Sequence, residues 1–291
     1  MTESRDSALL ITGATGNIGR ELCKTLCAQN VPFRAMVRAH NGEPATQIDG
    51  AKVVAGNFND ERFFAEALEG VDQAFLLTNS SELAEVQQVT FVDVAKRAGV
   101  KHIVKLSQWT ADPDSPVRFL RYHAAVEHKV RESGIAYTFV HPNLFMQGLL
   151  VFRNTIVGQG QFFAAAGAAR ISAVDVRDIA AVAAAALTGD GHRGITYDLT
   201  GPEGLTHGEM AETLSEAIGR EIRYVDVPPQ AMMKTLLNIG LPRWQVDGLI
   251  EDYAHYRRGE ASTITTGVHN ATGTPPRSFD DFARDYALVL S

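Results

Sequence analysis

Short apolar runs alternate with segments of helical periodicity along the first half of the chain. Residues 8–11 form an apolar run that is too short for a helix and typical of a strand buried on both faces. Ile18, Leu22 and Leu26 then recur at the spacing of one helix face. The same alternation predicts strands over 33–37, 52–55, 73–77, 102–106 and 137–140, and helices over 17–29, 59–67, 82–98 and 115–134. Asn59 and Ser115 are the expected N-caps of two of these helices.

Six strands joined in this way predict a doubly wound parallel sheet of the Rossmann type, which is an α/β fold. After about residue 143 the alternation becomes irregular. This half contains an alanine-rich helix over 174–187, strands over 196–199 and 222–227, a capping box over 206–209 and helical segments through 258. We expect a sheet domain over 1–143 and a smaller α+β substrate lobe over 144–291, with some of its segments rejoining the sheet.

Composition and charge narrow the class of protein. The 291 residues carry a formal net charge of -7, which argues against a surface that follows nucleic-acid phosphates. No apolar run reaches the roughly 18 residues that cross a bilayer, and the polar first residues differ from a signal peptide. The cysteines, Cys23 and Cys27, are expected to be small buried hydrophobes rather than a redox pair or a metal site. These features predict a soluble, cytoplasmic monomer or homodimer without metal, membrane or nucleic-acid partner.

A glycine-rich turn joins the first predicted strand to the first predicted helix. In the segment TGATGNIG, residues 12–19, Gly13 permits a tight turn, Gly16 lets the backbone approach a pyrophosphate, and Gly19 lets the helix pack closely on the strand. The helix N-terminus offers free N–H groups and a partial positive charge to phosphates. This context makes residues 1–143 an expected NAD(P)-binding domain. The residues expected around the pyrophosphate are Gly13, Thr15, Gly16, Asn17 and Ile18.

The end of the second predicted strand distinguishes NADP(H) from NAD(H). An NAD site usually has an acidic residue there, about 20 residues after the turn, that binds the ribose 2′-hydroxyl. Between residues 30 and 42 the chain has no acid but has Arg34, Arg38 and His40. Arg38 closes the predicted strand, and its guanidinium suits a 2′-phosphate. Arg34 is expected to face solvent. NADP(H) is therefore the preferred cofactor, and NAD(H) is the alternative.

Several longer segments resemble the NmrA-like branch of atypical short-chain dehydrogenases/reductases, nearly from end to end. Beside the glycine turn, the segments that carry the resemblance are GNFND (56–60), LEGVDQAFLLT (68–78), VKLSQW (104–109), HAAVE (123–127), SGIAYTFVHPNLFMQ (133–147), VDVRDIAAVAAAAL (174–187) and YDLTGPEGLTHGEMA (197–211). Of these, the HxxxE helix, HPNLFMQ and DVRDIA are the most specific to the branch. Relatives commonly have Asp where Asn57 stands and Arg where His141 stands.

The resemblance implies a role for residues at the ends of the predicted strands. Asn57 and Phe58 are expected to flank the adenine, and Leu77 and Thr78 to line the nicotinamide ribose. Ser107 and Gln108 are expected at the end of the fifth strand. The residues expected on the nicotinamide side of the pocket are Pro142, Asn143 and Phe145.

The helix over 115–134 holds the candidate catalytic residues. Val126 stands four residues after Tyr122, so the Tyr-x-x-x-Lys dyad of typical short-chain dehydrogenases is absent. The resemblance implies a catalytic role for His123, because a lysine acts as general base there in benzylic-ether reductase relatives and a histidine stands there in quinone reductase relatives. Glu127 lies one turn further on the same face, and we expect it to orient the imidazole and raise its pKa. The alternative is a structural pair that braces the helix.

Other residues receive simpler expectations. The residues expected at the substrate are Gln108, Trp109 and His123. Trp109 either walls the substrate pocket or packs in the core. Asp178 is expected to cap or anchor its helix, Arg177 to pair locally, and His207 to be exposed.

Two functions remain open at this point. The leading one is an NADPH-dependent reductase that transfers hydride to a conjugated small-molecule acceptor, such as a quinone, an azo or triarylmethane dye, or an imine. Without the Tyr-Lys dyad, such acceptors fit better than simple ketones, and the protein mainly orients the reactants and excludes water. The alternative is a sensor that binds NADP(H) and reports redox state to a protein partner. The fold alone does not separate the two.

Overall fold

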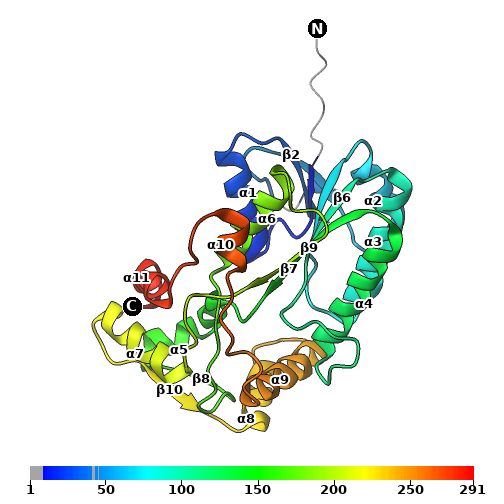
Figure 1. The fold of residues 1–291 in the computed structure, drawn as a ribbon. Coiled ribbons are helices and arrows are strands. Elements are labelled where there is room, and N and C mark those ends of the chain that lie inside the picture. The colour runs from blue at the N-terminus through cyan, green and yellow to red at the C-terminus, as the bar shows by residue number, and fades with distance from the viewer. Residues whose placement is uncertain (1–8, 41–42, 45) are drawn as a thin grey trace.

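The computed structural model describes residues 9–40, 43–44 and 46–291. Figure 1 shows a central sheet between two layers of helices, with a smaller lobe at one end. The strands of the central sheet are β1 (Leu9–Ile11), β2 (Phe33–His40), β3 (Glu43–Pro44), β4 (Ala51–Gly56), β5 (Gln73–Leu76), β6 (His102–Leu106), β7 (Ala136–Pro142) and β9 (Ile195–Leu199).

The central sheet has the doubly wound topology that the sequence predicts. Its parallel strands lie in the order β4-β2-β1-β5-β6-β7-β9, and β3 is antiparallel to the end of β2. β9 comes from the second half of the chain and pairs with β7, so that His141 lies opposite Asp198. The strand order reverses between β1 and β5, and ligands of such sheets bind beyond the carboxyl ends of the strands at this point.

Helices bury both faces of the sheet. One face is covered by α1 (Asn17–Ala28), α6 (Val176–Thr188) and α10 (Gly267–Thr272), and the other by α2 (Glu61–Leu68), α3 (Ala84–Ala98) and α4 (Arg118–Ser133) (Figure 1). In β1, Leu9 and Ile11 point into the first layer and Leu10 into the second, which explains why this strand is apolar throughout.

Two predicted helix starts are wrong. Asp60, and not Asn59, caps α2 by accepting a hydrogen bond from the Arg62 N–H, because Asn59 belongs to a turn closed by the Asn57 side chain. Ser115 accepts a hydrogen bond from the Val117 N–H, but this bond closes a turn before the helix begins. Such local side-chain bonds compete with helix capping within a residue or two.

The smaller lobe contains β8 (Gln161–Ala164), β10 (Arg223–Asp226), η1 (Met146–Phe152), α5 (Arg153–Gln159), α7 (His207–Ile218), α8 (Pro229–Asn238), α9 (Arg243–Arg257) and α11 (Phe279–Leu290). Its two strands pair in parallel. The predicted capping box of Thr206 and Glu209 is present at the start of α7. The expectation for His207 is wrong, because the ring is buried against Phe162 and Tyr224 and burial lowers its pKa to about 4.

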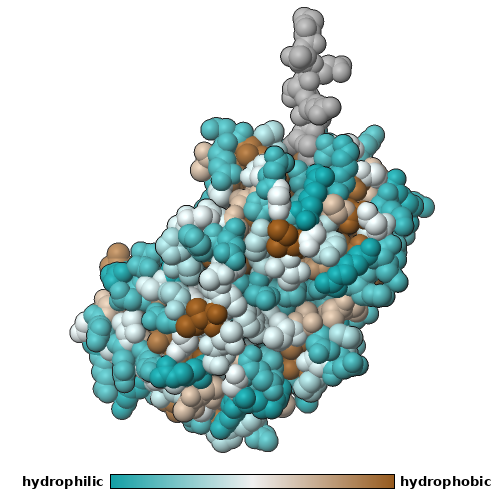
Figure 2. Space-filling view, viewed as in Figure 1, coloured by the Kyte–Doolittle hydropathy of each residue, from teal (hydrophilic) through white to brown (hydrophobic). Residues whose placement is uncertain are grey.

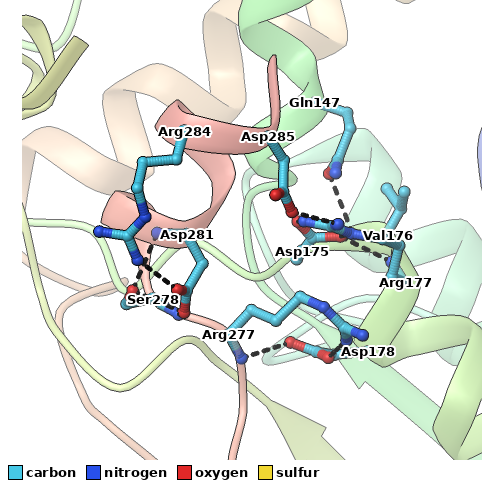
Figure 3. Close-up of polar contacts among 10 residues, drawn as sticks. All are labelled: Gln147, Asp175, Val176, Arg177, Asp178, Arg277, Ser278, Asp281, Arg284 and Asp285. Carbon is cyan, nitrogen blue, oxygen red and sulfur yellow. Dashed lines mark hydrogen bonds and ion pairs between the residues drawn. The ribbon is translucent and has the colours of Figure 1, made fainter. Parts of the chain in front are cut away.

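Charged residues fix α11 to the start of α6, as Figure 3 shows. Asp175, and not Asp178, caps α6, and its carboxylate also pairs with Arg177. The buried Asp178 instead accepts hydrogen bonds from the backbone and side chain of Arg277, so it anchors the segment before α11. Arg177 reaches Asp285 on α11 as well. The pair of Arg177 with Asp175 confirms the predicted local pairing of this arginine.

Two further expectations about individual side chains are wrong. Cys23 is buried as predicted, but Cys27 is exposed, because it lies at the end of α1. Arg34 does not extend freely into solvent, since its guanidinium donates to the carbonyl oxygens of Ala67 and Glu69 at the end of α2.

The surface is mostly hydrophilic on the face seen in Figure 2, where hydrophobic residues form small separate groups. No helix within the described ranges is long and apolar enough to cross a membrane.

Candidate functional site

The glycine turn after β1 is packed too tightly for larger residues. Gly13 has a φ of +64°, and a Cβ there would lie 2.9 Å from the Leu77 Cγ. A Cβ on Gly19 would lie 2.1 Å from the Gly13 carbonyl oxygen. No side chain caps α1, whose N-cap is Gly16. The first N–H groups of this helix therefore remain available to an anionic ligand.

A cavity of about 800 Å³ opens at this turn and is here called the main cavity. It lies at the carboxyl ends of the strands, where the strand order reverses. Nearly all predicted site residues line it: Gly13, Thr15, Gly16, Asn17, Ile18, Arg38, Asn57, Phe58, Leu77, Thr78, Ser107, Gln108, His123, Pro142, Asn143 and Phe145. The predicted residues that the structure does not place there are Trp109 and Glu127.

Arg38 lies at one end of the main cavity, near Asn57 and Phe58. β2 does not close at Arg38 as predicted but continues to His40. Strands β2 and β4 run parallel here with Arg38 opposite Gly56, which brings the predicted adenine-flanking residues beside the arginine. A Cβ at Gly56 would lie 2.3 Å from the Phe63 ring, so the close approach of β4 to α2 depends on this glycine.

His123 contacts a buried lysine that the sequence analysis did not single out. Lys105 on β6 is fully buried, and its Nζ lies 2.8 Å from the His123 Nδ1 and donates to the Leu106 carbonyl at 2.9 Å. Burial lowers the pKa of Lys105 to about 7, although the charge of Glu127 opposes this shift. Burial and the Lys105 charge hold the pKa of His123 well below its usual value. The expectation of a raised His123 pKa is wrong.

Glu127 has other partners than His123. Its carboxylate accepts hydrogen bonds from Ser107 Oγ, from His141 Nε2 at 2.7 Å and from Arg131 at 3.1 Å. Burial favours a higher pKa for Glu127, but the hydrogen bonds from His141 and Ser107 and the charges of His141 and Lys105 together outweigh it, and the pKa is lowered. Glu127 thus binds His141 at the end of β7, and it lies one helical turn after His123, which contacts β6.

His141 stands where the resemblance described above implies an arginine in relatives. Its Nδ1 lies 3.3 Å from the Asp198 carboxylate, while Nε2 binds Glu127. Burial opposes protonation of His141, but hydrogen bonds to Asp198 and Glu127 prevail and raise its pKa. The imidazolium can therefore replace an arginine as the cation between two carboxylates.

Trp109 is buried and lines a second cavity of about 800 Å³, together with Glu127, Arg131, His141 and Asp198. This second cavity is lined by residues of α4, β7 and β9. Within the residues that the structure describes, no group of three or more His, Cys, Asp or Glu side chains is arranged to hold a metal ion.

Part of the wall of the main cavity comes from α9, which the sequence did not place at the site. The α9 residues on this wall are Gln245, Leu249, Asp252, Tyr253 and Tyr256. Their spacing of four, three, one and three residues is that of a single helix face. This spacing was visible in the sequence, but it did not show where α9 packs. Phe119 and Tyr122 of α4 line the main cavity as well.

Comparison with known proteins identifies the family of this fold and site. A family model described as the NmrA-like family matches residues 5–262. The chain belongs to the NmrA-like family. This NmrA-like protein is 36% identical to the NAD(P)H azoreductase of Xenophilus azovorans over 282 residues, which covers 97% of this chain and 99% of the relative.

Solved structures of other reductases share the architecture of this NmrA-like protein. An NADPH-dependent quinone oxidoreductase from Escherichia coli, complexed with NADPH, superposes with a TM-score of 0.84 and 27% identity, covering 95% of this chain and 99% of that chain. A triphenylmethane reductase from Citrobacter sp., complexed with NADP(H), gives a TM-score of 0.84 and 26% identity over 96% of this chain and 99% of that chain.

Proposed function

We propose that this protein is an NADPH-dependent reductase that transfers hydride to a conjugated small-molecule acceptor. The observation that carries the proposal is one main cavity that extends from the glycine turn and Arg38 to the aromatic wall of α4 and α9. One end offers backbone N–H groups and a guanidinium to phosphates, and the other offers tyrosine and phenylalanine rings to a flat acceptor. The reductases to which the chain is similar support this assignment.

The residues of the main cavity fit a bound NADP(H). Gly13 and Gly19 keep the turn compact, so the pyrophosphate can reach the N-terminus of α1. We propose that Arg38 binds the 2′-phosphate and that Pro142, Asn143 and Phe145 position the nicotinamide, because all four residues line the main cavity. NADPH, when bound, supplies the hydride. The protein holds the acceptor against this end of the cavity and excludes water.

We propose that His123 supplies a proton or a hydrogen bond to the acceptor. When Lys105 donates to Nδ1, the proton of the neutral imidazole lies on Nε2. Nε2–H then donates its proton to the acceptor. Lys105 gives a proton to Nδ1, so the imidazole remains neutral. A lysine with a pKa of about 7 can give up this proton near neutral pH.

Replacing His123 by alanine or glutamine is expected to lower turnover of a neutral quinone by about tenfold or more while NADPH still binds, because neither side chain can pass a proton from Lys105 to the acceptor. Glutamine retains an acceptor for Lys105, so a loss in both variants does not reflect misfolding. Steady-state NADPH oxidation and fluorescence titration of NADPH provide the two measurements. His128→Ala, an exposed change on the same helix, serves as control. Unchanged turnover in both His123 variants would exclude the catalytic role.

Arg38→Ala is expected to weaken NADPH binding by roughly tenfold or more and to leave NADH binding unchanged, because only NADPH carries the 2′-phosphate. Isothermal titration with both dinucleotides measures the two affinities. Lys24→Ala removes an exposed positive charge from α1 away from the main cavity and is the matched control. Equal affinities that Arg38→Ala does not alter would contradict the role of Arg38.

NADPH oxidation with a panel of quinones, azo dyes, triarylmethane dyes and imines tests the reaction itself. Turnover with one of these acceptors supports the reductase. Tight NADPH binding without turnover of any acceptor would instead favour a sensor that acts through a protein partner.

A further inference from the structure

Asp252 is a buried carboxylate that faces the main cavity without a cationic partner. It lies on α9 and is 5% exposed. Among the residues that the structure describes, its two oxygens accept hydrogen bonds only from the Gln108 side-chain amide, at 3.1 and 3.2 Å. Across the described ranges, no lysine or arginine forms an ion pair with it. Its neighbour Glu251 points elsewhere and pairs with Arg118.

A carboxylate in this position is unfavourable in the absence of a ligand. Burial raises the pKa of Asp252 to about 7, since the single amide partner only partly offsets the loss of hydration. An isolated buried charge is costly unless a cation or several hydrogen bonds compensate it. The cavity is the open side from which a ligand can supply that cation.

The surroundings of Asp252 suit a flat cation rather than a small ion. Tyr253 and Tyr256 flank it on the same helix face, and Tyr122 lines the same cavity from α4. The rings of Tyr253 and Tyr256 meet edge to face, with centroids 5.4 Å apart. Aromatic faces attract delocalised positive charge, and the attraction is stronger where water is excluded. Gln108, after β6, ties the carboxylate to the strand ends that face the proposed nicotinamide site.

We propose that Asp252 and the tyrosines around it form a subsite for the positive charge of the acceptor, so that the protein selects flat cations, either iminium ions or triarylmethane carbocations, over neutral quinones. This inference rests on the proposed function for its hydride source, but binding at the subsite does not require turnover. Hydride adds to the electron-poor carbon of the cation and forms one C–H bond, which gives a neutral product without a further proton. The ion pair with Asp252 is then lost, which favours product release.

Asp252→Asn tests the subsite, because asparagine keeps the shape and can still accept from Gln108. The probes are crystal violet, a triarylmethane cation, and menadione, a neutral quinone. We expect the KM for crystal violet to rise by roughly tenfold or more. The Kd of crystal violet for the NADP⁺-loaded protein, measured by absorbance titration, is expected to rise by a similar factor. The KM and kcat for menadione are expected to change by less than about threefold. Asp247→Asn is the matched control, because it removes the same charge from α9 at a residue that pairs with Arg243. It is expected to leave the KM values for both acceptors unchanged.

Three outcomes would overturn the subsite. Unchanged crystal violet binding excludes an ion pair with Asp252. If the activity falls equally with both acceptors, Asp252 contributes to cofactor binding or to folding and not to recognition of a cation. Slower menadione reduction with unchanged crystal violet reduction makes Asp252 a proton donor instead. If the wild type reduces no acceptor of the panel described above, the proposed function fails, while the Kd of crystal violet still decides the subsite.

Discussion

Gly19→Ala is expected to destabilise the apo protein and to abolish measurable NADPH binding. The added Cβ would lie 2.1 Å from the Gly13 oxygen, 2.7 Å from its carbonyl carbon and 2.8 Å from the Ala14 Cα. All three contacts are with backbone, so no side chain can rotate away, and α1 must move off β1. Overpacking of this kind costs about 2 kcal/mol or more. The displaced helix no longer presents its N–H groups to the pyrophosphate.

Thermal unfolding of the apo protein and NADPH titration measure the two effects of Gly19→Ala. Gly158→Ala is the matched control, because a Cβ at that position in α5 meets nothing within 4 Å. The control is expected to keep or slightly raise Tm, since alanine restricts the unfolded chain more than glycine. A Gly19→Ala protein with the wild-type Tm and NADPH affinity would show that the turn tolerates a side chain.

Lys105→Met is expected to stabilise the protein near pH 6.5 and to lose this advantage as the pH rises to 10. Burial lowers the pKa of Lys105 from 10.5 to about 7, so between these values the unfolded chain binds a proton that the folded chain does not. The free energy of unfolding of the wild type therefore rises with pH across this window, and the penalty is fully present below pH 7. The shift corresponds to a penalty on the order of 5 kcal/mol.

Methionine removes this penalty but leaves the Leu106 carbonyl and His123 Nδ1 without the lysine hydrogen bonds, at a cost of about 1 kcal/mol each. We therefore expect Lys105→Met to be more stable by about 3 kcal/mol at pH 6.5 and less stable than the wild type near pH 10. Urea unfolding at both pH values measures the difference. Lys101→Met, at an exposed lysine paired with Asp72, should show no such reversal. If the difference in the free energy of unfolding between Lys105→Met and the wild type did not change with pH, the pKa of Lys105 would not be lowered in the folded protein.

Local sequence signals predicted much of the site because of where they lie in a parallel sheet. The glycine turn, Thr78 and Ser107 come just after the carboxyl end of a strand and Arg38 lies two residues before one, and such ends meet along one edge. For this reason, the sequence predicts that these residues, far apart in the chain, line one cavity, and the prediction requires no knowledge of side-chain packing. The same reasoning failed at Trp109, which comes directly after Gln108 but lines the second cavity.

The sequence by itself determined the doubly wound α/β fold, the glycine-rich turn after the first strand and the absence of the Tyr-Lys dyad, because each depends on periodicity or on residues close together in the chain. Only the tertiary structure decided which groups meet. Lys105 reaches His123 from β6, His141 meets Asp198 through the register of β7 and β9, and Asp252 reaches Gln108 from α9. Helical spacing paired Glu127 with His123, but one turn of α4 is enough to bring the two side chains to different strands. Strand register and helix packing are set by the burial of whole faces, so they fix these partners in ways that spacing along the chain does not encode.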